Sequence, residues 1–134
     1  MAMMEVTMGN WIRVLSVAGL LSLAACRMAP VYNQQTTPSE APPDATLEHV
    51  TKAIKQAGLN LGWRMTEEEP GRIIGTLNLR RHQAVVEILF DTESYSITYL
   101  DSTNLKYDGA EIHQNYNSWI RNLSNAIYAQ ISSI

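Results

Sequence analysis

Cysteine is almost missing from this 134-residue sequence, because Cys26 is its only one. A single cysteine excludes an intramolecular disulfide. Positive charge is also scarce, with 10 Lys and Arg against 13 Asp and Glu, a formal net charge of −3. Such a mildly acidic chain lacks the basic footprint of a nucleic-acid-binding protein. We therefore expect no nucleic-acid partner.

The sequence also lacks the residue spacings that mark common catalytic and metal sites. It contains no nucleophile elbow, no paired-carboxylate motif and no metalloprotease motif. No cysteine or spaced carboxylate joins His82 and His113 in a metal-binding pattern. We expect no catalytic residues, no metal and no cofactor apart from a covalent lipid, and hence a protein that is not an enzyme. A small hydrolase with a spatially assembled site is the third alternative.

Long apolar runs are confined to the N-terminus. Arg13 precedes an apolar run of 12 residues from Val14 to Ala25, too short for a bilayer that needs about 20 helical residues. A positive charge followed by a short apolar run is the layout of a secretory signal. Residues 1–25 are therefore predicted to be a signal peptide, with Met8 as a candidate initiator.

The apolar run ends in Leu23-Ala24-Ala25-Cys26, which resembles the lipobox of bacterial lipoproteins. The resemblance implies cleavage before Cys26, a diacylglyceryl group on its thiol and an acyl group, such as palmitate, on its amine. Two or more acyl chains anchor a protein stably to a membrane. Arg27 stands where an Asp is the usual signal for retention in the inner membrane. We therefore expect the outer membrane, with the domain in the periplasm.

Residues 26–45 hold four of the five prolines and little that could form a core. This composition predicts a disordered tether between the acylated cysteine and the domain. A flexible chain of this length has a root-mean-square span of about 25 Å.

Residues 46–134 are predicted to form one small α+β domain. Apolar spacings of three and four predict helices over 46–58 and from near Ala110 to the C-terminus. Between them, alternating residues predict four strands, starting near Trp63, Ile73, His82 and Tyr95. The expected fold is a four-stranded antiparallel meander with an N-terminal and a C-terminal helix on one face, in the order α-β-β-β-β-α.

The sequence from Gly62 onward resembles a small family of uncharacterised Gram-negative envelope lipoproteins. The resemblance rests on the motifs GTL at 75–77, SYSITY at 94–99, STNLKY at 102–107 and IHQNYNSWI at 112–120. It implies location and fold and brings no activity.

Tyrosines and amides gather in the second half of the chain. Tyr95 and Tyr99 are predicted to lie on the sheet face opposite the helices, as an aromatic strip that binds a partner, or else to cover that face and bond to loop backbone. The first hairpin is predicted to carry a basic cluster, Arg80, Arg81 and His82, at one end and the acidic residues Glu67–Glu69 at the other. This charge separation either orients the domain toward an acidic partner or lipid headgroups, or reflects only two solvated turns. The candidate binding residues are Tyr95, Tyr99, Asn104, Tyr107, His113, Tyr116, Asn117, Trp63, Arg80 and His82.

The sequence therefore predicts a lipid-anchored, non-catalytic accessory module. Its expected partners are the membrane, through the acyl chains, and another envelope protein or a cell-wall component. The binding surface is either the Tyr95/Tyr99 sheet face or the loop at 102–109. The alternative is a binder of a small molecule or glycan, in a pocket between the sheet and the last helix that uses Trp63, His113 and Asn117.

Overall fold

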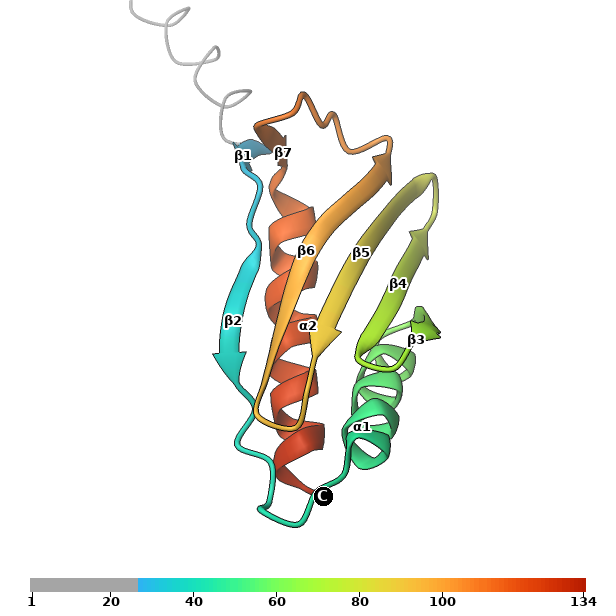
Figure 1. Cartoon of the computed structure of the whole chain (residues 1–134). Coiled ribbons are helices and arrows are strands. Elements are labelled where there is room, and N and C mark those ends of the chain that lie inside the picture. The colour runs from blue at the N-terminus through green and yellow to red at the C-terminus, as the bar shows by residue number, and fades with distance from the viewer. Residues whose placement is uncertain (1–26) are drawn as a thin grey trace, which may run out of the picture.

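Two helices and two antiparallel sheets make up the part of the chain that the computed structural model describes, residues 27–134 (Figure 1). The expected signal peptide and Cys26 lie outside these residues. The elements are β1 (Met28–Pro30), β2 (Gln34–Pro38), α1 (Leu47–Asn60), β3 (Trp63–Glu69), β4 (Arg72–Leu79), β5 (His82–Phe90), β6 (Ser94–Thr103), β7 (Glu111–His113) and α2 (Gln114–Ser132).

The larger sheet has five strands in the order β2-β6-β5-β4-β3, and every neighbouring pair is antiparallel. The expected α+β class is confirmed, and β3 to β6 follow one another as a meander. The expectation of four strands is wrong, because β2 adds a fifth strand beside β6. A separate two-stranded sheet pairs β1 with β7.

The segment expected to be a disordered tether contains two of these strands. β1 pairs Met28 with His113, and β2 pairs Gln34 with Ile97. Two of the four prolines that argued for disorder stand at strand ends, Pro30 in β1 and Pro38 in β2, and the other two lie in the loop before α1. Both strands lie at sheet edges, where the missing N–H of proline breaks no ladder. The described fold therefore includes residues 28–38, which the prediction left outside the domain.

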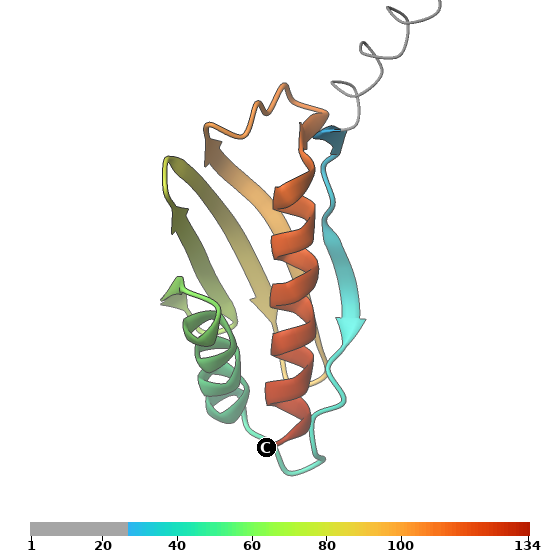
Figure 2. The ribbon, with the colours of Figure 1, turned by 180° about the vertical axis from the view of Figure 1, so that it is seen from behind.

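Both helices lie on the same face of the five-stranded sheet (Figures 1 and 2). α1 begins after Thr46, whose hydroxyl accepts from the His49 N–H at 3.2 Å, while the His49 ring accepts from the Thr46 N–H. α1 packs beside α2 and along β3. The last helix begins at Gln114 rather than near Ala110, because the preceding residues 111–113 pair with β1.

The core fills the space between the sheet and the two helices. Alternate strand residues such as Ile73, Val86, Ile88 and Ile97 are fully buried, and they meet a helix stripe that includes Ile120. An antiparallel sheet covered on one face leaves the other face to solvent. On that open face Arg72 and Glu87 form a salt bridge of 2.8 Å between β4 and β5.

Tyr95 and Tyr99 lie on the covered face, so the predicted aromatic strip on the open face is wrong. Tyr95 is 2% exposed, its hydroxyl donates to the Ser124 carbonyl at 3.1 Å, and the Ser124 hydroxyl is 2.9 Å away. The two tyrosines share the alternation of Ile97, which is fully buried. Their position therefore follows from the strand period, which puts every second residue on the same face.

Candidate functional site

Several segments meet at the end of the domain where the described chain begins (Figure 1). We call this the N-terminal end and define it as residues 27–30, the turn from Leu79 to His82, and the segment from Asn104 to His113. Hydrogen bonds join these pieces. The Asn104 side chain donates to the Arg81 carbonyl at 2.7 Å, and the Asn104 carbonyl lies 2.8 Å from the His82 Nδ1. The His113 N–H donates to the Leu105 carbonyl at 2.9 Å.

The loop between β6 and β7 is built on one buried residue and one carboxylate. Leu105 is 2% exposed and anchors the loop to the core. The Asp108 carboxylate accepts from the N–H groups of Glu111 at 2.7 Å and Ala110 at 2.9 Å. These backbone hydrogen bonds hold the Asp108 pKa below its ordinary value. The loop thus has a fixed shape, with an ionised carboxylate turned into its own backbone.

Three tyrosine rings, which we call the tyrosine stack, join this loop to the core, and the Tyr99 ring contacts the other two. The Tyr99 ring lies 4.2 Å from the Tyr107 ring and 5.6 Å from the Tyr116 ring, centroid to centroid. Tyr107 is exposed on the outside, and Tyr116 is fully buried at the first turn of α2. Among residues 27–134, the Tyr116 hydroxyl is a buried side-chain group with no hydrogen-bond partner.

Two of these three rings are shielded from ionisation by burial. Burial raises the pKa of Tyr116 far above its ordinary value of 10.0, and burial also raises the pKa of Tyr99. The Tyr99 hydroxyl lies 2.8 Å from the Ser102 hydroxyl, and neither has a base beside it in the described hydrogen bonds. The contacting tyrosines therefore leave the amphipathic ring of Tyr107 exposed at the surface of the loop.

Asn117 and His113, which were predicted to line a ligand pocket, have structural contacts. The Asn117 side chain accepts from the Tyr32 N–H at 2.9 Å and donates to the Pro30 carbonyl at 2.9 Å. It therefore clasps the backbone between β1 and β2. His113 caps α2, its ring nitrogen accepting from the Asn115 N–H at 3.2 Å.

Trp63 does not complete such a pocket, because it is 3% exposed within the core. The structure therefore does not assemble the predicted pocket of Trp63, His113 and Asn117. It does bring together most of the other candidates, which lie at the N-terminal end or in its stack: Tyr99, Asn104, Tyr107, Tyr116, Arg80 and His82.

The N-terminal end carries most of its charge as exposed cations. Arg80 and Arg81 form the turn between β4 and β5, Lys106 lies in the loop, and Arg27 precedes β1. The salt bridges among residues 27–134 are Lys52–Glu48 and Arg72–Glu87, so none of the four cations is paired there. Sequence reasoning did not group Lys106 and Arg27 with the arginine turn, because only the topology shows that their segments meet it.

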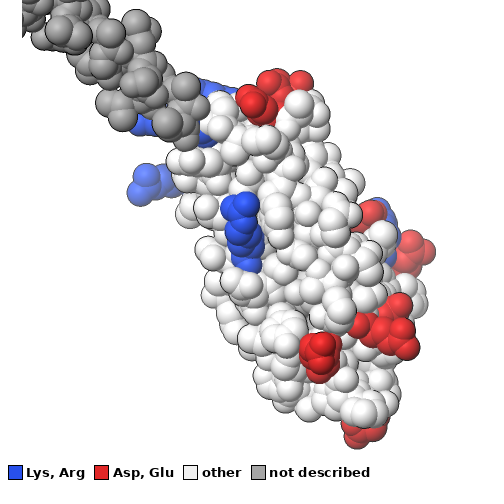
Figure 3. Space-filling model, turned by 90° about the vertical axis from the view of Figure 1, so that its left-hand side faces the viewer, with Lys and Arg blue, Asp and Glu red and all other residues white. Residues whose placement is uncertain are grey.

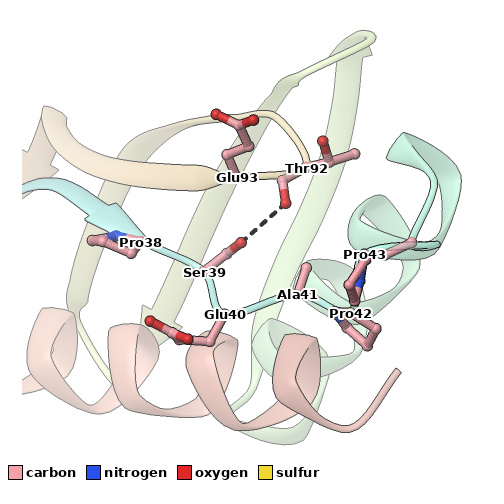
Figure 4. A pocket seen from close by; sticks show the side chains of 9 residues that line it. Pro38, Ser39, Glu40, Ala41, Pro42, Pro43, Thr92 and Glu93 are labelled. Carbon is pink, nitrogen blue, oxygen red and sulfur yellow. Dashed lines mark hydrogen bonds between the residues drawn. The ribbon is translucent and has the colours of Figure 1, made fainter.

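The opposite end of the domain is acidic and holds a shallow hollow of about 360 Å³. The loop at 38–43 and the turn between β5 and β6 line it (Figure 4). The buried Ser39 joins them, because its hydroxyl donates to the Thr92 carbonyl at 3.3 Å and its N–H to the Glu93 carbonyl at 2.8 Å. The carboxylates of Glu40 and Glu93 point away from that bond (Figure 4). No polar groups of these lining residues converge in the hollow. Its hydrogen bonds serve to hold the loop at 38–43 against the turn between β5 and β6.

Within residues 27–134 no three His, Cys, Asp or Glu side chains lie close enough together to hold a metal ion. The helices of this part of the chain include none with the length and apolarity needed to cross a membrane. No protein-family model, no curated protein and no solved structure matches the chain.

Proposed function

We propose that this chain is a lipoprotein of the bacterial envelope, anchored through Cys26, whose domain is a non-catalytic binding module. The lipobox-like run Leu23-Ala24-Ala25-Cys26 is the sequence basis for the anchor. Arg27 in place of the usual Asp favours the outer membrane, with the domain on the periplasmic side. The binding surface is the N-terminal end, and its partner is a component of the envelope.

The observation that carries this proposal is the position of β1. The described fold begins at Met28, two residues after Cys26, and Met28 pairs with His113. Two residues of chain span at most about 7 Å, against about 25 Å for the flexible tether that the composition predicted. A lipid on Cys26 would therefore hold the N-terminal end beside the membrane.

The side chains at this end support binding rather than catalysis. Tyr107 is exposed and is held in place by its contact with Tyr99. A rigid aromatic ring contributes contact area without a large loss of side-chain entropy on binding. The histidines at this end, His82 and His113, bond to a backbone carbonyl and to a helix N-terminus.

Replacing the cysteine tests the anchor. Cells that express the full chain or its Cys26→Ser variant are labelled with a palmitate analogue and fractionated. The proposal expects the label and the membrane retention to be lost in the variant and kept in a control, Ser16→Ala, which alters the same apolar run. Labelling that persists in Cys26→Ser would show that the anchor assignment is wrong.

Photocrosslinking tests the binding surface. A photoreactive phenylalanine analogue at Tyr107 keeps an aromatic ring on Tyr99, and the same analogue at Thr92 reports on the opposite end. We expect adducts with an envelope component, lipid or protein, from position 107 and few from position 92. Equal yields from the two positions would contradict the surface assignment.

A further inference from the structure

The N-terminal end combines unpaired cations with exposed apolar groups. Leu79 is 47% exposed and Tyr107 is 42% exposed, at the turn and in the loop that Asn104 ties together. The exposed cations of this end are Arg27, Arg80, Arg81 and Lys106, and its carboxylates are Asp108 and Glu111. Four cations against two carboxylates give this end a positive net charge.

The backbone at two of these cations is unfavourable for a long side chain. Arg80 has φ of 56° and Lys106 has φ of 55°, both in the left-handed region where Gly and Asn are preferred. A two-residue hairpin turn such as that at 80–81 usually contains Gly or Asn. The cations therefore stand where folding alone favours other residues, which points to a role outside the fold.

We propose that the N-terminal end docks on the anionic phospholipid surface of the membrane that holds the lipid on Cys26. The inference rests on the proposed function, because the short distance from Cys26 to Met28 brings this end to the membrane. Arg and Lys bind headgroup phosphates, and a Tyr ring and a Leu side chain suit the boundary between headgroups and acyl chains. The docking surface consists of Arg80, Arg81, Lys106, Leu79 and Tyr107.

The end of the domain opposite the docking surface is negatively charged. Its exposed carboxylates include Glu40, Asp44, Glu67, Glu68, Glu69, Asp91 and Glu93. In the face that Figure 3 presents, Lys and Arg lie mainly in the half near the grey trace, and most Asp and Glu lie in the other half. An anionic surface attracts the first end and repels the second, so the long axis of the domain stands upright on the membrane.

A fluorophore at each end of the acylated protein tests the orientation. Acylation shields Cys26, so a single new cysteine, Ala110→Cys or Thr92→Cys, is labelled selectively in the full chain extracted from membranes. Each protein is reconstituted into vesicles of phosphatidylethanolamine and phosphatidylglycerol that contain headgroup-nitroxide lipid as quencher. Quenching several-fold stronger at position 110 than at 92 is expected, and it should weaken with added salt or in phosphatidylcholine vesicles.

Charge-removing variants identify the residues that dock. Arg80→Gly and Lys106→Gly each remove a cation where glycine fits the backbone, so both domains should be at least as stable as the parent. Each should lower the ratio of docked to undocked protein about fivefold, since a cation near an anionic surface contributes about 1 kcal/mol. Lys55→Gln and Arg64→Gln remove the same charge from α1 and β3 and should leave docking unchanged.

The outcomes separate the two proposals. A chain that takes up no acyl label overturns the anchor and this inference with it. An acylated chain that is quenched equally at 110 and 92, or docks equally well after Arg80→Gly and Lys106→Gly, overturns the inference and leaves the anchor intact. A photoreactive group at position 110 that yields one dominant protein adduct and no lipid adduct also overturns it.

Discussion

The ring of Tyr107 lies against the ring of Tyr99, with their centroids 4.2 Å apart and their planes inclined by 34°. Tyr99 belongs to β6 and Tyr107 to the loop that follows, so the contact fixes the loop to the sheet. Tyr116 closes the far side of Tyr99 with an edge contact at 71°. The exposed ring is therefore part of a rigid stack that reaches into the core.

Two variants of Tyr107 should distinguish the contribution of its ring to stability from that of its hydroxyl. Tyr107→Ala removes the stacking on Tyr99, and such aromatic pairs contribute about 1 kcal/mol beyond area burial. Tyr107→Phe keeps the ring and should leave the free energy of unfolding nearly unchanged. Urea denaturation of the two variants measures both values. Equal losses in Ala and Phe would mean that the hydroxyl, not the stack, holds the loop.

The hydroxyls of Tyr116 and Tyr95 should respond in opposite ways to removal. The Tyr116 hydroxyl is buried without a partner among the described residues, so Tyr116→Phe should leave stability unchanged or raise it by up to about 1 kcal/mol. The Tyr95 hydroxyl bonds to Ser124, so Tyr95→Phe should lower stability by about 1 kcal/mol. Thermal unfolding of the pair checks both. A clear loss in Tyr116→Phe would reveal a partner for that hydroxyl.

Asn117 should control the attachment of the N-terminal strands. Asn117→Ala leaves the Tyr32 N–H and the Pro30 carbonyl without their partner, which should destabilise the domain by about 2–3 kcal/mol. Amide hydrogen exchange at Tyr32 should accelerate in the variant. Asn115→Ala, an exposed position two residues earlier, is the control and should change stability by less than about 0.5 kcal/mol. Unaltered exchange at Tyr32 would show that strand pairing alone holds the segment.

The acid limb of the stability curve should depend on the two turn carboxylates. Backbone hydrogen bonds from Glu93 and Ser94 lower the Asp91 pKa, and those from Glu111 and Ala110 lower the Asp108 pKa, from an ordinary 3.8. The unfolded chain then binds more protons near that pH, so stability falls as the pH drops through this range. Asp108→Asn should make the fall shallower. An acid limb identical to that of the parent would contradict the assignment.

At alkaline pH the stability of the domain should fall as the pH rises. Burial raises the pKa of Tyr95, Tyr99 and Tyr116 above the ordinary value of 10.0. Above pH 10 the unfolded chain releases tyrosine protons that the folded chain retains, so stability falls as the pH rises. Tyr116→Phe should reduce this fall, as measured by urea unfolding between neutral and alkaline pH. The same slope in parent and variant would mean that Tyr116 ionises freely in the folded state.

Local patterns in the sequence were sufficient for α1, α2 and the strands of the meander. Their apolar residues recur with the helix or strand period, and turns such as that at Gly71 separate them. β1 and β2 have no such pattern, because distant partners hold them: β7 and β6 by pairing, and Asn117 by its side chain. Long-range contacts of this kind leave no local signal.

The candidate site was only partly accessible from the sequence. The loop at 102–109 and the arginine turn were identified, but their meeting through Asn104 and His82 depends on the order of β4, β5 and β6. The sequence did contain the information that places Tyr95 on the covered face. Tyr95 lies two residues from Ile97 in the same strand, so the two side chains point to the same face, and Ile97 is fully buried. The role of Asn117 had none, because an amide that clasps backbone and an amide that binds a ligand look alike in sequence.

The clasp of Asn117 on Pro30 joins residues 87 positions apart, and its bond to Tyr32 spans 85. Contacts of such long range form late, because a large loop must close first. β1 and the segment that follows it are therefore synthesised first but fold last, because their partners lie near the C-terminus of the chain. If the chain is exported as proposed above, we expect it to stay extended during translocation and to pair these strands only after its C-terminal helix has emerged.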